Sequence, residues 1–364
     1  MHEFEYNVLP SRVVFGSGSV NKLPNEIKRL GVSRPLILST AGRSHYADQI
    51  SGVLKAGSID AAGIFPRAKQ HTPTEVSEEA AAILRQLSAD CVVSVGGGSV
   101  IGLGKAVSIR TGVPHICLPT TYSGSEMTPI LGETKDGKKT TRSDAKILPG
   151  VMIYDADLTV SLPPAVSSTS GVNAMAHAVE ALYAKNTNPV ISLMSLEGIR
   201  ALVESLPKLV QNPNSKDARD TALYGSWLCG TALGSTNMGL HHKLCHVLGG
   251  TFGLPHAETH CIMLAHTLAY NAPCIPGIMT KLASVFPESN GDAVRGLELL
   301  LDKLQVTRSL KDIGLKESDI SQAVEIATSG QYPNPRVLEA HGIRDLLRRA
   351  WAGDSARVIP NSEL

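Results

Sequence analysis

The sequence lacks three features that would each indicate a particular environment: Cys-x-x-Cys pairs, a long apolar run and an apolar leader. Its six cysteines lie in apolar segments, as reduced core thiols do, so we expect no disulfide framework. No apolar run approaches the about 18 residues that a membrane span needs. The first residues carry acids and do not form the apolar region of a signal peptide. We therefore expect a soluble, cytoplasmic protein without a membrane partner.

An excess of charge of one sign is also missing. The formal net charge is +1, and acidic and basic residues are intermixed along the chain. Because no basic block stands out, we expect no nucleic-acid partner. The 364 residues are too many for one core, and 43% of them are hydrophobic, which is enough for two.

The first part of the chain alternates short apolar runs with amphipathic stretches. Continuous apolar runs separated by helical patterns indicate a parallel sheet that helices cover on both faces. The expected strands are Pro35–Thr40, Asp90–Val95, His115–Leu118 and Val151–Tyr154, and the expected helix is Glu75–Leu87 with Thr74 as its cap. This pattern predicts an α/β domain with a Rossmann-like parallel sheet over residues 1–160.

After the joint at Leu162-Pro163-Pro164 the periodicity becomes helical, and no comparable strand candidate follows. The expected helices are Ser192–Val210, Ala218–Leu233, Leu240–Leu248, Thr259–Tyr270, Ala293–Leu304 and Ile343–Trp351. We therefore predict an all-α domain over residues 161–364.

A glycine-rich turn follows one expected strand and precedes a helical pattern that starts at Val100. Backbone N–H groups in such a turn can approach a phosphate without hindrance from a Cβ, and the helix N-terminus adds partial positive charge. The turn matches neither G-x-G-x-x-G nor a P-loop, and it could also be a turn that only packs tightly. The residues that would bind a pyrophosphate are Gly96, Gly97, Gly98 and Ser99.

A second polar turn, residues 119–126, follows the next strand. Hydroxyls at the carboxyl end of a parallel strand line the crevice in which α/β sheets bind ligands. The alternative is an ordinary helix start that Ser123 or Ser125 caps. Because two such turns follow successive strands, we expect a shared ligand site, with candidates Thr120, Thr121, Tyr122 and Ser125.

Histidines are concentrated in one region, where six of the twelve lie between residues 241 and 266. His242 and His246 are four residues apart and share a helix face. We expect Gly249-Gly250 to break that helix and His256 to return in a loop. Two histidines on one face and a third from a loop could bind zinc or iron, or form a proton relay.

The remaining histidines lack this convergence. His177 lies in a helical stretch elsewhere, and a lone histidine on a helix is more often a surface or satisfied core residue than a ligand. Within the histidine-rich region, we expect His241 to point outward and His266 to be structural. The role of His260 is left open.

Together these motifs resemble the iron-containing alcohol dehydrogenase family. The matching stretches are Gly-Gly-Gly-Ser at 96–99 with Lys105, Pro-Thr-Thr at 119–121 with Gly-Ser-Glu at 124–126, Asn-Ala-Met-Ala-His at 173–177, and His242, His246 and His256. The resemblance covers nearly the whole chain. It implies the dehydroquinate synthase-like architecture, with a dinucleotide domain, a helical domain and an active site between them. It also implies a homodimer formed through the N-terminal domain.

The metal-binding positions depart from the pattern of that family. An Asp and three His usually hold its metal, and these positions are here Asn173, His177, His242 and His256. A neutral amide is a poor ligand for a hard divalent cation, although three histidines could still bind zinc. The replacement, with the stretch 241–260, resembles a branch of the family that works without metal, the maleylacetate reductases. That resemblance implies no metal and a small dicarboxylate substrate.

Two further departures concern the cofactor. Gly102 stands where the family usually has Asp, and Thr40 follows the first expected strand, where NAD-selective relatives often have Asp. Without a carboxylate to bond the ribose hydroxyls and repel a 2′-phosphate, we predict that both NADH and NADPH are used. Lys139 corresponds to a lysine that reaches the cofactor in relatives, and we expect Tyr122 to border the nicotinamide.

The resemblance also assigns roles in the pocket. His246 is the expected proton donor, because it shares a face with His242 but is not a metal-ligand position in relatives. His177, His242 and His256 complete the catalytic set, and Asn173, Lys243 and Arg142 are candidates for binding the substrate. Three alternatives stay open: a metal-dependent alcohol or polyol dehydrogenase, a lyase similar to dehydroquinate synthase, and a nucleotide-binding scaffold without activity.

Overall fold

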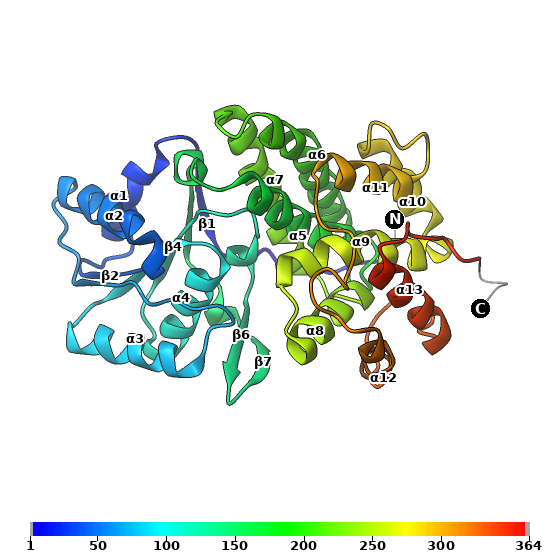
Figure 1. Cartoon of the computed structure of the whole chain (residues 1–364). Helices are drawn as coiled ribbons and strands as arrows, with labels where there is room; N and C mark the ends of the chain where they lie inside the picture. The colour runs from blue at the N-terminus through cyan, green and yellow to red at the C-terminus, as the bar shows by residue number, and fades with distance from the viewer. Residues whose placement is uncertain (1–2, 361–364) are drawn as a thin grey trace. The chain divides into compact units, whose positions relative to one another are not determined.

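The computed structural model describes residues 3–360, except for the side chain of Lys139. The chain divides into two compact units, Val8–Leu162 and the part from Pro163 onward, which also takes up the segment that ends at Asn7. Figure 1 shows strands flanked by helices in the first unit, and the second unit, in green to red, built from helices.

The first unit contains a six-stranded sheet. Its strands are β1 (Arg12–Phe15), β2 (Pro35–Leu38), β3 (Gly63–Phe65), β4 (Cys91–Gly96), β5 (His115–Pro119) and β8 (Val151–Tyr154). The strand order is β1-β8-β5-β4-β2-β3, and every pair is parallel. All carboxyl ends therefore meet at one edge of the sheet, where α/β proteins bind their ligands.

Helices cover both faces of this sheet (Figure 1). Helices α1 (Leu23–Arg29) and α2 (Ser44–Ala56) pack on one face, and α3 (Thr74–Gln86) and α4 (Gly98–Thr111) on the other. Strand β2 shows why, because Ile37 joins the core with α1 and α2, whereas Leu36 and Leu38 join the core with α3 and α4. All three side chains are fully buried, which explains a continuous apolar run in place of an alternating one.

The four predicted strands are confirmed, with small changes at their ends. The strand expected at Pro35–Thr40 stops at Leu38, and Thr40 instead precedes a 3-10 turn, Ala41–Arg43. The expected cap of α3 is wrong. Thr74 is the first residue of that helix, and its hydroxyl donates to the carbonyl oxygen of Thr134 at 3.2 Å.

Sequence reasoning missed the short strands β1 and β3 and an antiparallel hairpin. The hairpin consists of β6 (Ile130–Lys135) and β7 (Lys138–Ser143), which pair with each other and form a separate two-stranded sheet. Its second strand, KKTTRS, contains no apolar residue. A strand without an apolar run gives no periodicity to detect.

The second unit is helical, and its described residues contain no strand. Its helices are α5 (Pro164–Leu182), α6 (Pro189–Gln211), α7 (Lys216–Ser235), α8 (Leu240–Phe252), α9 (His256–Asn271), α10 (Pro276–Val285), α11 (Ala293–Lys303), α12 (Ile320–Thr328) and α13 (Ala340–Ala352). Helix α5 packs against α6, α7 and α9, so every residue from Ser170 to Leu182 is buried. A second core joins α8, α9, α12 and α13.

The helix that carries His242 is longer than predicted. Gly249 and Gly250 lie inside α8 and do not break it, and the helix ends at Phe252 before Gly253, whose φ is +71°. Glycine is suited to this left-handed position at a helix end. Pro255 then precedes α9, so His256 is the first residue of a helix and not part of a loop.

Two further observations concern the apolar length of the helices and the state of the cysteines. None of the helices in the described part of the chain is both long and apolar enough to span a bilayer. None of the six cysteines forms a disulfide. Five of them are buried as expected, and Cys274 is exposed.

Candidate active site

The predicted glycine turn lies between β4 and α4. A Cβ built on Gly97 would lie 2.9 Å from Cγ2 and 3.1 Å from Oγ1 of Thr121, so the threonine packs directly against the turn. Helix α4 begins at Gly98, two residues earlier than predicted, with Gly97 as its N-cap. The N–H groups of a 14-residue helix and a threonine hydroxyl therefore meet at the carboxyl edge of the sheet. This arrangement suits a phosphate.

The second polar turn lies beside the first. Its hydroxyls include Ser123 Oγ and Ser125 Oγ, which are 3.3 Å apart. The chain then forms a short 3-10 helix, Ser125–Met127, whose N-cap is Gly124 and which has no side-chain cap. A serine-capped helix start is therefore wrong.

The cofactor residue that fits least well is Tyr122. It is fully buried, and its hydroxyl donates to Thr159 Oγ1 at 3.2 Å. The ring therefore has no exposed surface with which to border a nicotinamide.

A buried lysine holds the second turn in place. Lys105 Nζ lies within hydrogen-bond distance of four oxygens, which share its three N–H groups. These are the carbonyl oxygens of Ser125 (2.7 Å), Thr128 (2.8 Å) and Ile130 (3.0 Å) and the hydroxyl Thr128 Oγ1 (2.9 Å). Burial lowers the pKa of Lys105 to about 8. The sequence marks this residue by placing a lysine on the otherwise apolar face of α4.

Gly102 has a steric explanation in the structure. A Cβ at this position would lie 2.5 Å from Thr72 Oγ1. Thr72 is buried and has a φ of +46°, which is uncommon for a β-branched residue. The space beside residue 102 is thus already filled, and an aspartate there would displace Thr72.

The other residues expected near the cofactor lie on exposed or half-buried segments. Thr40 is half-buried at the end of β2. Arg142, on β7, is exposed and bonded to Glu133 Oε2 at 3.3 Å. Lys139 is on the same strand, but its side chain lies outside the described part of the structure.

The helical unit brings together the four histidines that were expected to be catalytic. His177 comes from α5, His242 and His246 from α8, and His256 from α9. The ring centroids of His177 and His242 are 5.0 Å apart, and those of His242 and His246 are 6.1 Å apart. His256 connects to this group through His260, with centroid distances of 4.4 Å from His256 to His260 and 5.1 Å from His260 to His242.

A buried carboxylate orients two of these rings. His242 Nδ1 lies 2.5 Å from Glu180 Oε2, and His242 Nε2 lies 2.8 Å from His177 Nδ1. Burial pushes the pKa of Glu180 up, but the charge and hydrogen bond of His242, with His241, outweigh it and the net shift is downward. Glu180 is therefore an acceptor, so His242 donates through Nδ1. In its neutral form His242 then accepts from His177 through Nε2.

Glu180 escaped the sequence analysis, although it lies three residues after His177 on the same helix. Glu180 also lines a pocket together with Tyr183, Lys185 and Asn237, and its volume of about 260 Å³ is large enough for several waters.

A second chain of hydrogen bonds, separate from the one through Glu180, His242 and His177, begins at Thr267. The Thr267 hydroxyl donates to the carbonyl oxygen of Met263 at 2.9 Å, so it accepts from His241 Nδ1 at 3.0 Å. His241 is neutral, because burial, with the neighbouring His242, lowers its pKa to about 3. Its Nε2 therefore accepts from His260 Nδ1 at 2.9 Å.

This chain corrects the expectation for His241 and gives His260 a defined chemistry. His241 does not point outward; it is fully buried. Burial also lowers the pKa of His260 well below its usual value, so the ring is neutral and its Nε2 is a hydrogen-bond acceptor. That atom is buried and has no partner among the described residues. A group that binds to it must supply an N–H, an O–H or positive charge.

Family models match both parts of the chain. An iron-containing alcohol dehydrogenase model covers residues 10–156, and the C-terminal model of the Fe-containing alcohol dehydrogenase family covers residues 167–351. The chain belongs to the iron-containing alcohol dehydrogenase family. It is therefore an oxidoreductase.

Within this family, the chain is similar to maleylacetate reductases over its full length. Maleylacetate reductase from Rhizobium sp. (strain MTP-10005) is 49% identical and aligns over 97% of this chain and 99% of the relative. The crystal structure of maleylacetate reductase from Agrobacterium tumefaciens is 49% identical, with a TM-score of 0.93 over 98% of this chain and 100% of the other. An iron-containing alcohol dehydrogenase from Corynebacterium glutamicum ATCC 13032 is 38% identical, with a TM-score of 0.91 over 96% and 97% of the two chains.

The family's expected metal positions form a poor donor set in this chain. Asn173 offers a neutral amide oxygen, which is buried and has no partner among the described residues. His177 and His242 use the nitrogens that face each other in a direct hydrogen bond. A hard divalent cation favours a carboxylate at the first position. The set therefore lacks the carboxylate that the family's metal site usually has.

A different set of ligand atoms does converge. In the described part of the chain, one nitrogen each of His241 and His260 and the Cys245 sulfur all lie within 4.8 Å of one another. Burial raises the pKa of the Cys245 thiol well above its usual value, and the two nitrogens already share a hydrogen bond. His241 thus already contacts both His260 and Cys245 through hydrogen bonds of the core.

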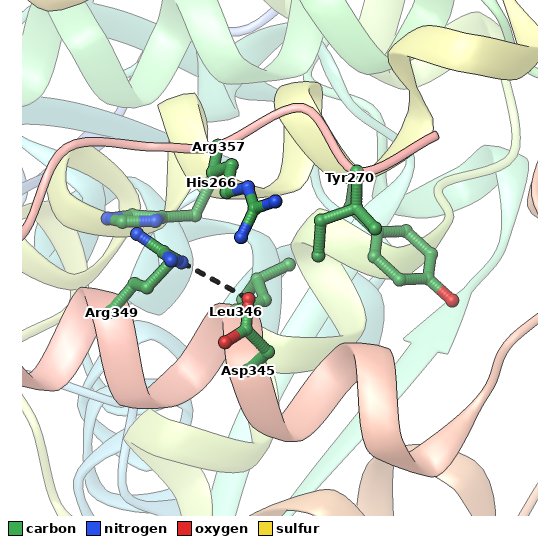
Figure 2. Close-up of a pocket in the computed structure, with 7 residues that line it drawn as sticks. His266, Tyr270, Asp345, Leu346, Arg349 and Arg357 are labelled. Carbon is green, nitrogen blue, oxygen red and sulfur yellow. Dashed lines mark hydrogen bonds and ion pairs between the residues drawn. The ribbon is translucent and has the colours of Figure 1, made fainter. Parts of the chain in front are cut away.

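His266 and Lys243, the two remaining residues that the sequence analysis discussed, do not belong to the group of His177, His242, His246, His256 and His260. His266 is buried in a pocket with Tyr270, Asp345, Arg349 and Arg357 (Figure 2), whose volume of about 10 Å³ leaves room for roughly one water. A pocket of this size supports the expected structural role. Lys243 Nζ lies 5.9 Å above the ring of Tyr332.

Proposed function

We propose that this protein catalyses the NAD(P)H-dependent reduction of the carbon–carbon double bond of maleylacetate to give 3-oxoadipate. The observation that carries this function is Asn173, in place of the family's metal-binding carboxylate, on the same helix as His177 in the histidine cluster. The names of the full-length relatives support the same substrate.

The chemistry needs one hydride and one proton. Maleylacetate carries two carboxylates and a double bond conjugated to a ketone. The reduced cofactor supplies the hydride to the alkene carbon β to the ketone. Negative charge then develops on the ketone oxygen, and the α-carbon must receive a proton. Imidazole groups can stabilise the charge and donate the proton near neutral pH.

In this proposal His246 donates the proton. It is exposed on α8, one turn beyond His242, so it can exchange protons with solvent between turnovers. Both nitrogens of His242 are already hydrogen-bonded, so in this proposal His242 and Glu180 orient His177. His177, with a proton on Nε2, and His256 then donate hydrogen bonds to the ketone oxygen and stabilise its charge. The exposed position of His246 distinguishes it from the buried rings of His177 and His242.

The substrate carboxylates need polar partners. We assign this role to Asn173 and Lys243, since the ammonium of Lys243 has a cation–π contact but no carboxylate partner among the described residues. Arg142 is a weaker candidate, because Glu133 already pairs with it.

We further propose that the α/β unit binds the cofactor and the helical unit carries the catalytic imidazoles. The turns described above supply the cofactor residues Gly96, Gly97, Gly98, Ser99, Thr120, Thr121 and Ser125. We assign Thr40 to the adenosine ribose, and the resemblance adds Lys139 as a further cofactor residue. Because no carboxylate stands at Thr40, both NADH and NADPH are substrates. A thousandfold bias of kcat/KM towards NADH would contradict dual use.

We place the reaction in the degradation of aromatic compounds, in a cytoplasmic homodimer. Sedimentation of the purified protein tests the dimer, and a monomer at micromolar concentration would exclude it.

Product analysis tests the function itself. With maleylacetate and NADH, the product should be heavier than the substrate by two hydrogen atoms and identical to 3-oxoadipate. The retention of His177, His242 and His256 favours one competing function, a metal-dependent alcohol or polyol dehydrogenase. Oxidation of alcohols with added zinc or iron, and no reduction of maleylacetate, would establish that function instead.

A further inference from the structure

The carboxyl end of β2 lies next to the glycine turn. Strand β2 pairs directly with β4, and Leu38 is in register with Ser94. Neighbouring strands are about 4.8 Å apart, so the residues that follow β2 adjoin the turn that follows β4. In a bound dinucleotide the adenosine ribose adjoins the pyrophosphate, and recognition of its 2′ position usually comes from this part of the fold.

The residues after β2 carry no negative charge. Ser39 and Thr40 follow the strand, and Ala41, Gly42 and Arg43 form the 3-10 turn. A Cβ at Gly42 would meet nothing within 4 Å, so the surface of this turn is open. Nothing in this segment would repel a 2′-phosphate.

Arg43 is held at this edge by a neutral group. Its Nη1 donates to Ser161 Oγ at 2.9 Å. Ser161 Oγ in turn lies 2.6 Å from the Tyr46 hydroxyl, and that hydroxyl donates to the carbonyl oxygen of Leu158 at 2.8 Å. The direction of this chain leaves Ser161 Oγ as the acceptor for Arg43. The guanidinium is therefore positioned without being neutralised.

Other arginines of this unit do not share these properties. Arg67, just after β3, pairs with Glu79 at 2.7 Å and stacks on Phe65 with 4.6 Å between its guanidinium carbon and the ring centroid. Arg34 lies at the amino end of β2 and donates to the carbonyl oxygens of Leu87 and Ser88. Arg43 is half-buried, and among the described residues it has no carboxylate partner.

We propose that Arg43 binds the 2′-phosphate of NADPH and so determines how well the protein uses this cofactor relative to NADH. A guanidinium matches a phosphate in charge and in the geometry of its paired N–H donors. The inference rests on the proposed NAD(P)H-dependent function, because it assigns the phosphate end of the same cofactor.

Calorimetric titration tests the assignment without any turnover. Wild-type protein and Arg43→Ala are titrated with NADPH, NADH, adenosine 2′,5′-bisphosphate and AMP. Loss of a charge-assisted contact should weaken NADPH and the bisphosphate about ten- to a hundredfold more than NADH and AMP. Arg34→Ala removes the same charge from the other end of β2 and should leave the ratio between the two cofactors unchanged.

Two results would overturn the proposal. One is an equal loss of affinity for both cofactors, which would place Arg43 at the pyrophosphate or adenine. The other is an unchanged affinity of Arg43→Ala for NADPH, or no measurable binding of NADPH by the wild type. If Arg43→Ala does not fold, Thr40→Asp provides a second arm, and it should weaken NADPH at least tenfold relative to NADH through repulsion of the phosphate.

The same titrations separate this inference from the proposed function. They contain no maleylacetate, so a protein that binds both cofactors but does not reduce maleylacetate would refute the function and leave the role of Arg43 intact. A protein that reduces maleylacetate with a cofactor ratio unaffected by Arg43→Ala would do the reverse.

Discussion

The two units prepare their polar groups in different ways. In the α/β unit, the cofactor candidates are backbone N–H groups and hydroxyls, placed by glycines and by one buried lysine. In the helical unit, the candidates are imidazoles. Two chains of hydrogen bonds, which start at Glu180 and Thr267, determine which of their nitrogens donate and which accept. The first site depends on space and the second on the direction of hydrogen bonds, so different changes should damage each.

The largest effect is expected at His246. His246→Ala should reduce kcat about a hundredfold or more, because it removes the proposed general acid. His341→Ala removes an exposed imidazole from α13 in the same unit and serves as the control. Steady-state kinetics with maleylacetate make the comparison, and an unchanged kcat in His246→Ala would remove this residue from the mechanism.

The corresponding change in the α/β unit is steric. In Gly97→Ala the new methyl group would lie 2.9 Å from Thr121 Cγ2, and either the turn or the threonine must move. We expect the Kd for NADH to rise about tenfold or more, in line with the cost of overpacking, with kcat less affected. Gly52→Ala, where a Cβ meets nothing within 4 Å, is the control. Equal cofactor affinity in both variants would show that the turn is not a close-approach site.

The units should also differ in their response to acid. Burial lowers the pKa of His115 in the α/β unit to about 3, and in the helical unit it lowers His241 to about 3, His266 to about 4 and His260 well below its usual value. The folded state therefore keeps these rings neutral. The stability they allow is complete above pH about 6.5, the pKa in the unfolded chain, and falls as pH decreases towards the folded values, by up to about 1.4 kcal/mol per pH unit for each ring.

The helical unit contains three such rings and the α/β unit contains one. We therefore expect acid to destabilise the helical unit more. Both tryptophans, Trp227 and Trp351, lie in the helical unit, so their fluorescence reports its unfolding. The urea midpoint by fluorescence should fall between pH 7 and pH 5.5. His266→Gln should make this fall shallower, and His341→Gln should not. A midpoint that does not change with pH would contradict neutral buried histidines.

The smallest effect is expected at Thr267, where the hydrogen-bond chain through His241 and His260 begins. Thr267→Val keeps the shape of the side chain but removes the acceptor of His241 Nδ1. An unpaired buried donor should cost about 1–3 kcal/mol of unfolding free energy. Thr280→Val, on the exposed part of α10, is the control. Identical denaturation curves for Thr267→Val and the wild type would mean that the hydrogen bond from His241 to Thr267 does not stabilise the fold.

Local patterns predicted most of the fold. Val151–Tyr154 has the predicted bounds, because a short apolar run that is buried on both faces has few alternatives. Helices such as α6 extend the predicted ranges by a few residues and keep their order, but α10 and α12 had no predicted counterpart. The hairpin was missed because polar strands pair through their backbones without an apolar pattern.

The site was less predictable, since it depends on which neighbours surround each helix face. His241 and His242 are adjacent in sequence, and the sequence cannot show that α9 covers the first and that Glu180 of α5 bonds the second. The double glycine was expected to end α8, but the helix continues because its left-handed end is formed by Gly253. The four-residue interval placed His242 and His246 on one helix face, and the family resemblance added His177 to them. The hydrogen-bond chains that orient these rings needed the tertiary structure.

The claim that imidazoles replace the family's metal is tested most directly by following NADH oxidation at 340 nm with maleylacetate, before and after treatment with a strong chelator, with the metal content of each sample measured. The account predicts the same kcat in both samples, with far less than one zinc or iron per chain after treatment. Loss of activity on chelation, restored by adding zinc or iron, would contradict it and would return His177, His242 and His256 to a metal.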